Sequence, residues 1–115
     1  MLAWMGFNYL RIRRAAKIVD NEEFEALIRT GQLIDLRDPA EFHRKHILGA
    51  RNIPSSQLKT SLAALRKDKP VLLYENQRAQ RVTNAALYLK KQGFSEIYIL
   101  SYGLDSWKGK VKVEK

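Results

Sequence analysis

Short apolar runs alternate along the chain with segments whose apolar residues recur every three or four positions, and this predicts strands and helices in alternation. Asp20 or Asn21 can cap the first helix, and Gly31 supplies its stop. Three apolar residues share one face of this helix: Phe24, Leu27 and Ile28. The run from Leu33 to Leu36 then predicts a buried strand.

The next segment predicts two more helices around an extended stretch. Asp38 and Pro39 combine a cap with a first-turn proline, which opens a short helix. Residues 50–54 are typical of extended chain. Ser55 or Ser56 can cap the following helix, whose apolar face carries three leucines: Leu58, Leu62 and Leu65.

The second half of the chain repeats this alternation. Residues 71–74, VLLY, predict a buried strand, and a short polar loop leads into a helix with four residues on its apolar face: Val82, Ala85, Ala86 and Leu89. Gly93 ends that helix, and residues 97–100, IYIL, predict a last strand before a turn that contains Gly103. Strands alternating with helices indicate an α/β fold, with a parallel sheet covered by helices on both faces.

The length and composition fit a single folded unit. At 115 residues the chain suits one domain, which buries roughly two-thirds of the surface of the unfolded chain around one core. Hydrophobic residues make up 45% of the chain and aromatic residues 10%, a globular composition without internal repeats. We divide the chain into an N-terminal segment, residues 1–17, and a folded domain, residues 18–115.

The formal net charge of +9 raises nucleic acid or an anionic membrane as a partner. The first ten residues, MLAWMGFNYL, are apolar but too few to span a membrane, which takes about 20. A basic cluster follows directly: Arg11, Arg13, Arg14 and Lys17. This order is typical of the exit of a membrane segment, and it equally fits a first helix packed on its own domain. The other basic residues are scattered, so nucleic acid is not expected as a partner.

Cysteine is absent from the whole chain, which excludes disulfides, a thiolate nucleophile and cysteine metal sites. A cysteine-free chain suits oxidising and reducing compartments equally well. The localisation is therefore inferred from the N-terminal segment alone. We expect a cytoplasmic protein, with the alternative that this segment holds it at the inner face of the membrane through anionic lipid.

The stretch LIDLRDPAEFHRKHILGARNIP, residues 33–54, resembles the signature of rhodanese-like domains. It shares a strand that ends in Asp35 and Arg37, an acidic and aromatic pair, and the segment His-Ile-x-Gly-Ala followed by Asn-Ile-Pro. PVLLY before the loop and LKKQGF after it extend the resemblance over residues 18–108. The resemblance implies an α/β fold around a parallel sheet of about five strands. It also implies sulfur transfer, because active members carry a persulfide on a cysteine at the start of the loop.

That cysteine is missing here, and its position falls on one of two residues. Counting forward from PVLLY places Glu75 there, whereas counting back from the Gly-Phe after the helix places Asn76 there, with Arg81 as the arginine near the loop's end. The difference implies a loop one residue longer than in common sulfurtransferases. The candidate binding loop is the whole segment: Glu75, Asn76, Gln77, Arg78, Ala79, Gln80 and Arg81.

The sequence offers no clear substitute for the missing thiol. A carboxylate nucleophile at Glu75 needs a metal or a general acid, and no neighbouring residue supplies one. His43 and His46 are spaced to share a metal, but no further ligand is evident, so neither a metal nor another cofactor is expected. Asp35 and Arg37 are expected to support the site by tying down loop amides.

Three functions therefore remain open. The chain is a non-catalytic rhodanese-like domain that binds or regulates an unknown protein, or a domain that recognises a small anion or phosphate through the loop with Arg78 and Arg81, or an enzyme with unrecognised chemistry. The missing thiol favours the first. We further predict that the carboxylate of Glu75, or the side-chain oxygen of Asn76, turns toward the loop's N–H groups or arginines and closes the site from within. A Glu75 that points into water is the competing interpretation.

Overall fold

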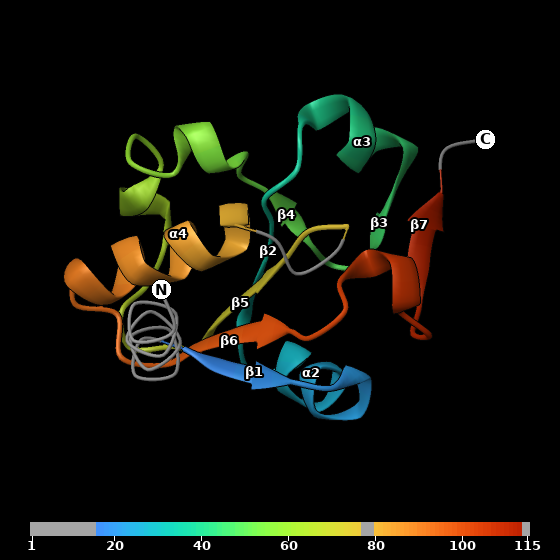
Figure 1. Cartoon of the computed structure of the whole chain (residues 1–115), viewed down its shortest axis with the longest axis horizontal. Helices are drawn as coiled ribbons and strands as arrows, with labels where there is room; N and C mark the ends of the chain where they lie inside the picture. The colour runs from blue at the N-terminus through green and yellow to red at the C-terminus, as the bar shows by residue number, and fades with distance from the viewer. Residues whose placement is uncertain (1–15, 77–79, 114–115) are drawn as a thin grey trace, which may run out of the picture.

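A five-stranded sheet, with strands in the order β1-β6-β5-β2-β4, organises the computed structural model, which describes residues 16–76 and 80–113 (Figure 1). All four neighbouring pairs run parallel. The strands are β1 (Lys17–Val19), β2 (Gln32–Asp35), β4 (Arg51–Asn52), β5 (Val71–Tyr74) and β6 (Ile97–Leu100). The predicted α/β fold with a parallel sheet is confirmed.

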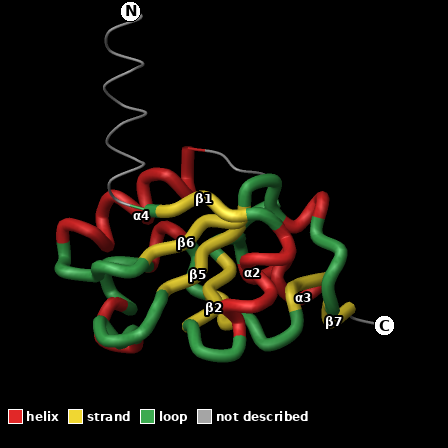
Figure 2. Tube along the Cα trace, turned by 90° about the horizontal axis from the view of Figure 1, so that it is seen from below, coloured by secondary structure: helices red, strands yellow, loops and turns green. Residues whose placement is uncertain are grey.

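Two helices cover opposite faces of this sheet, α2 (Asn21–Ile28) and α4 (Gln80–Lys91) (Figures 1 and 2). Successive residues of β5 point to opposite faces, as the strand period of two requires. Leu73 packs in the cluster that contains α4, whereas Leu72 and Tyr74 pack in the cluster that contains Phe24 of α2. Every residue of β5 is therefore buried, and its carboxyl end delivers the chain into the candidate loop.

The signals predicted to begin α2 and to end α2 and α4 differ in their outcome. The carboxylate of Asp20 caps α2, accepting a hydrogen bond from the backbone N–H of Glu23 at 2.9 Å, as predicted. Gly93 lies just after the end of α4 and has a φ of 98°, the left-handed conformation expected of a glycine that ends a helix. Gly31 has no such φ; a Cβ there would lie 2.9 Å from a methyl carbon of Leu72, so this glycine permits close packing instead.

The helix predicted from Ser55 or Ser56 through Leu65 is wrong. The segment forms two separate 3₁₀ turns, η1 (Ser55–Gln57) and η2 (Leu62–Ala64). Between them the hydroxyl of Thr60 donates to the carbonyl of Gln57 at 3.0 Å, a local bond that competes with helix propagation. Burial of Leu58 and Leu65 was the correct part of the pattern, because both lie in the core.

Three short strands were not predicted from the sequence. They are β1 and the antiparallel pair β3 (Lys45–Ile47) and β7 (Val111–Val113). The short helix after Pro39 is confirmed as α3 (Pro39–Arg44), although the side chain of Asp38 makes no cap bond. His46 stacks on Phe42 with ring centroids 3.8 Å apart, and its Nδ1 lies 2.7 Å from the Phe42 carbonyl oxygen. Its role in these contacts is structural.

Most of the N-terminal segment, and with it the predicted packed helix or membrane contact, lies outside the described residues. The division between residues 17 and 18 stays a prediction, and Lys17 is the first residue of β1. Among the helices of the described chain, none has the length and apolar character needed to cross a membrane.

Candidate functional site

The site begins where β5 ends, and its first residue turns inward. Glu75 is only 7% exposed, although a carboxylate is among the groups least often buried without partners. Its Oε2 accepts a hydrogen bond from the backbone N–H of Val82 at 2.9 Å. Its Oε1 lies 3.8 Å from Nε of Arg81. The carboxylate thus turns inward and approaches Arg81, one of the predicted partners, but the N–H that it bonds is that of Val82, one residue past the predicted loop.

The bond to Val82 makes Glu75 a cap for α4 that comes from outside the helix. The first N–H groups of a helix have no partner within it, and the helix dipole places partial positive charge at that end. Val82 is the third residue of α4, so its N–H is one of these groups. The carboxylate accepts this N–H and places negative charge at the positive end of the helix dipole. It therefore fixes the start of α4 relative to the end of β5.

Replacement of Glu75 by alanine should lower the free energy of unfolding by about 1–3 kcal/mol, because a buried N–H loses its charged acceptor. Urea unfolding followed by circular dichroism measures the change. Glu25→Ala is the matched control, since Glu25 is exposed on α2. Equal midpoints for the two variants would mean that the Glu75 carboxylate contributes nothing as a cap.

Asn76 links the end of β5 to the segment around α3. Its Oδ1 accepts from Nη1 of Arg37 at 3.0 Å, and its Nδ2 donates to Oε2 of Glu41 at 2.7 Å. The side-chain amide thus bonds a cation through its oxygen and a carboxylate through its nitrogen. Asn76 is held by side chains, whereas Glu75 is held by the helix amide, so the two candidates for the cysteine position have different surroundings.

Asp35 and Arg37 form a buried pair beneath this end of the sheet, with 0% and 4% of their surfaces exposed. Asp35 accepts from the backbone N–H of Arg37 at 2.9 Å, and both of its oxygens accept from the guanidinium at 2.8–3.1 Å. Nη2 of Arg37 also donates to the carbonyl of Lys45. Burial alone would lower the pKa of Arg37, but the hydrogen bond and charge of Asp35 outweigh it and raise that pKa. The guanidinium of Arg37 therefore stays charged, and its Nη1 also bonds the side chain of Asn76. The predicted role of the pair in tying down loop amides stays a prediction.

Tyr74 extends this buried pair and was not anticipated as part of the site. Its hydroxyl oxygen accepts from the backbone N–H of Ile47 at 3.0 Å, which ties β5 to β3. Burial, reinforced by the charge of Asp35, raises the pKa of the Tyr74 hydroxyl well above its ordinary value. The phenol therefore stays protonated and serves as a structural group.

A tight turn holds the backbone of the site from the other side. The carbonyl of Glu75 accepts from the N–H of Leu104 at 2.8 Å, and that of Asn76 accepts from the N–H of Asp105 at 3.0 Å. Gly103 precedes them with a φ of 70°, and a Cβ there would lie 2.5 Å from the Glu75 oxygen and 2.4 Å from the Asn76 oxygen. The sequence indicated a turn at Gly103, but not that it packs under the end of β5.

The structure thus gathers most of the predicted site residues around the carboxyl end of β5: Asp35, Arg37, Glu75, Asn76 and Arg81. Gln80 opens α4 and donates from its Nε2 to Oδ1 of Asn84 at 2.8 Å. Gln77, Arg78 and Ala79 lie outside the described residues. Within residues 16–76 and 80–113, no group of three or more His, Asp or Glu side chains could hold a metal ion. The site offers charge and hydrogen bonds but no thiol.

A family model and several curated proteins match most of the chain. Residues 20–110 match the model of the family described as the rhodanese-like domain. The chain is 47% identical to protein YqhL of Bacillus subtilis (strain 168) over 99% of its own length and 90% of that protein. It is 36% identical to the thiosulfate sulfurtransferase GlpE of Stutzerimonas stutzeri (strain A1501), over 80% of this chain and 84% of that one.

Among solved structures, a rhodanese-related protein from Thermoplasma volcanium superposes with a TM-score of 0.76 at 24% identity, covering 85% of this chain and 99% of that chain. A thiosulfate sulfurtransferase from Pseudomonas aeruginosa superposes with a TM-score of 0.74 at 26% identity, covering 85% of this chain but 20% of that larger chain.

Proposed function

Because the chain belongs to the rhodanese-like domain family and yet contains no cysteine, we propose that it is a non-catalytic member that acts as a binding or regulatory module. Persulfide transfer in this family depends on a thiolate, and no other side chain in the chain can form that intermediate. The relatives named as thiosulfate sulfurtransferases supply the fold comparison, and their activity is not carried over to this chain. Its partner would be another protein.

One observation carries the proposal: the Glu75 carboxylate is buried at the start of α4 and accepts the Val82 N–H. A buried carboxylate held in this way repels a thiosulfate or phosphate anion instead of attracting it. Within residues 16–76 and 80–113, no cluster of His, Asp and Glu side chains could hold the metal that would assist a carboxylate nucleophile. This contact likewise favours the binding module over the alternative in which the loop itself recognises an anion.

The purified protein should release no sulfite from thiosulfate in the presence of cyanide, and should not hydrolyse aryl phosphates, because it has no thiol to carry either group. A colorimetric assay for thiocyanate and one for phenolate measure these outcomes, with GlpE of Stutzerimonas stutzeri as the positive control. Turnover that disappears in Glu75→Gln would make the carboxylate a working nucleophile and overturn the proposal.

A membrane position at the cytoplasmic face is a further part of the proposal, supported by sequence alone. The apolar first ten residues precede four basic ones, each worth about 1 kcal/mol beside an anionic membrane. The intact chain should sediment with vesicles that contain phosphatidylserine, and less so as salt rises. A version that starts at Lys17 is the control, and equal sedimentation of both would remove the membrane contact.

A further inference from the structure

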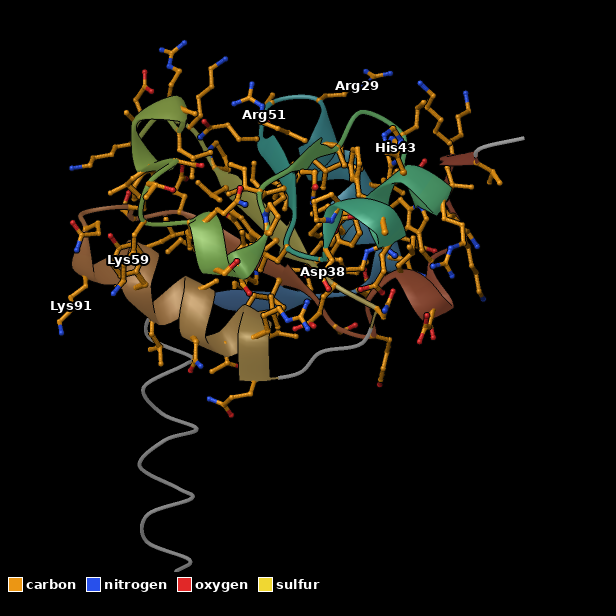
Figure 3. All side chains as sticks on the ribbon, turned by 90° about the horizontal axis from the view of Figure 1, so that it is seen from above. Arg29, Asp38, His43, Arg51, Lys59 and Lys91 are labelled. Atoms are coloured by element: carbon orange, nitrogen blue, oxygen red, sulfur yellow. The ribbon has the colours of Figure 1, made fainter. Side chains whose placement is uncertain are left out.

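A groove of about 260 Å³ lies between the segment with η1 and α4, next to the candidate loop. Figure 1 shows the segment with η1 passing over α4, and Figure 3 labels Lys59 beside that helix. The volume falls just below the range of roughly 300–1,000 Å³ typical of pockets for drug-sized ligands. It therefore suits a smaller molecule. Of the residues that line the groove, Arg81 also contacts Glu75, and the others make none of the contacts described above for Glu75 and Asn76.

The polar groups that line the groove are suited to binding an anion. Two are cationic, Lys59 and Arg81, and two are the hydroxyls of Ser55 and Ser56. Among the described residues that line it, none is acidic. Arg81 is 41% exposed along its side chain, and its Nε lies 3.8 Å from Glu75, beyond a direct hydrogen bond, so its guanidinium can still donate to a ligand.

Asn84 adds another donor because of how its amide is used. Its Oδ1 accepts from Nε2 of Gln80 at 2.8 Å. The amide oxygen is engaged along the helix, so the group that Asn84 offers to the groove is its NH₂. Cations, hydroxyls and an amide N–H thus face the same space, which is the donor set of an oxyanion site.

The rest of the lining is apolar, formed by Leu58, Ala85 and the ring of Tyr88. Leu58 and Ala85 belong to the buried core, so this wall is supported from behind. Nζ of Lys59 lies 5.6 Å from the centroid of the Tyr88 ring, so the cation lies over an aromatic face of the same groove. A ligand with an anionic head and a flat apolar part matches this layout.

We propose that this groove binds a small organic phosphomonoester, with its phosphate at Lys59, Arg81 and Asn84 and its apolar group against Tyr88. A dianionic phosphate uses several donors at once, and the aromatic wall distinguishes the ester from inorganic phosphate. The groove is separate from the loop amides. Binding in the groove does not depend on the proposed lack of catalysis, which the sulfite and phenolate assays test independently.

The binding is tested by titrating the full chain with phenyl phosphate, with inorganic phosphate and phenol as comparison probes, and following backbone amide shifts by NMR. Phenyl phosphate should saturate with the largest shifts at Ser56, Lys59 and Asn84, and should bind more tightly than either comparison probe. No saturation, equal affinity for inorganic phosphate, or shifts confined to Arg37 and Asn76 would overturn the assignment.

Charge variants give a second, independent readout. Lys59→Gln should weaken phenyl phosphate binding by about twofold to fivefold, the range of exposed ion pairs. Lys91→Gln removes the same charge from the far end of α4 and should leave the affinity unchanged. Equal weakening by both would mean that the net charge, and no built site, attracts the anion.

Glu75 should oppose the ligand, because it shares Arg81 with the groove. Glu75→Gln keeps an acceptor for Val82 and removes the competing charge, so the affinity should rise by about twofold to fivefold. Glu96→Gln, at an exposed position before β6, is the charge-matched control. An unchanged affinity in Glu75→Gln, or an equal rise in both variants, would contradict the role assigned to Arg81.

Discussion

Asp35→Ala is expected to lower the free energy of unfolding by about 3–5 kcal/mol, because it leaves the guanidinium of Arg37 buried without its carboxylate. Such a loss is a large part of the roughly 5–15 kcal/mol that stabilises a typical domain. Arg37 is 4% exposed and makes three of its side-chain bonds to Asp35. Guanidinium chloride unfolding, followed by tryptophan fluorescence, measures the change.

The chain contains a matched control for this variant. Arg66 and Asp68 are also two residues apart and form a pair at 2.6 Å, but both side chains are more than half exposed. Asp68→Ala should barely move the unfolding midpoint, because solvent screens an exposed pair. Removing both charges of the buried pair, in Asp35→Asn with Arg37→Leu, should be milder than Asp35→Ala. If Asp35→Ala and Asp68→Ala shifted the midpoint equally, burial would not govern the pair.

Gly103→Ala should lower the free energy of unfolding by roughly 3 kcal/mol or more, through two separate effects. The backbone of Gly103, at φ 70° and ψ −167°, is in a region open almost only to glycine, where another residue costs about 1–3 kcal/mol. The added Cβ would also lie 2.4–2.5 Å from the carbonyl oxygens of Glu75 and Asn76. Relief of this overlap requires the backbone bonds of the turn to shift.

Gly49→Ala separates the two effects. Gly49 has a φ of 91°, and a Cβ there meets no atom within 4 Å, so only the backbone term applies. This variant should lose about 1–2 kcal/mol, the usual amount for a left-handed residue with a side chain. Thermal and urea unfolding of both variants provides the comparison. Equal losses would show that the contact beneath β5 tolerates a methyl group.

Strands β2, β5 and β6 and the two covering helices were predictable because their signals are local. The apolar runs at 71–74 and 97–100 are long enough to be buried on both faces, and they became β5 and β6. β3 and β7 were not predictable in this way, since each has three residues and the two pair across the chain, Ile47 with Val111. A ladder that short carries almost no periodicity.

The same distinction explains which parts of the site could be inferred. Asp35 and Arg37 lie two residues apart at the end of a strand, so their pairing could be predicted from the sequence. The bond from Asn76 to Glu41 joins residues 35 positions apart and depends on where α3 packs. The groove beside α4 required knowledge that η1 lies against that helix, and the predicted helix at 55–65 would have placed Lys59 differently.

The position of β1 at the edge of the sheet has a mechanical consequence. β1 pairs only with β6 among the strands of the five-stranded sheet, in parallel register from Lys17 opposite Tyr98 to Val19 opposite Leu100. Tension applied to the chain ahead of residue 16 acts along β1 and shears it against β6, so that the bonds of the pair share the load. The N–H of Ser101, which donates to the carbonyl of Val19 at 2.9 Å, lies at the far end of that pair. A pull on the N-terminal segment is therefore resisted first by the pairing of β1 with β6, one strand away from β5 and the candidate loop.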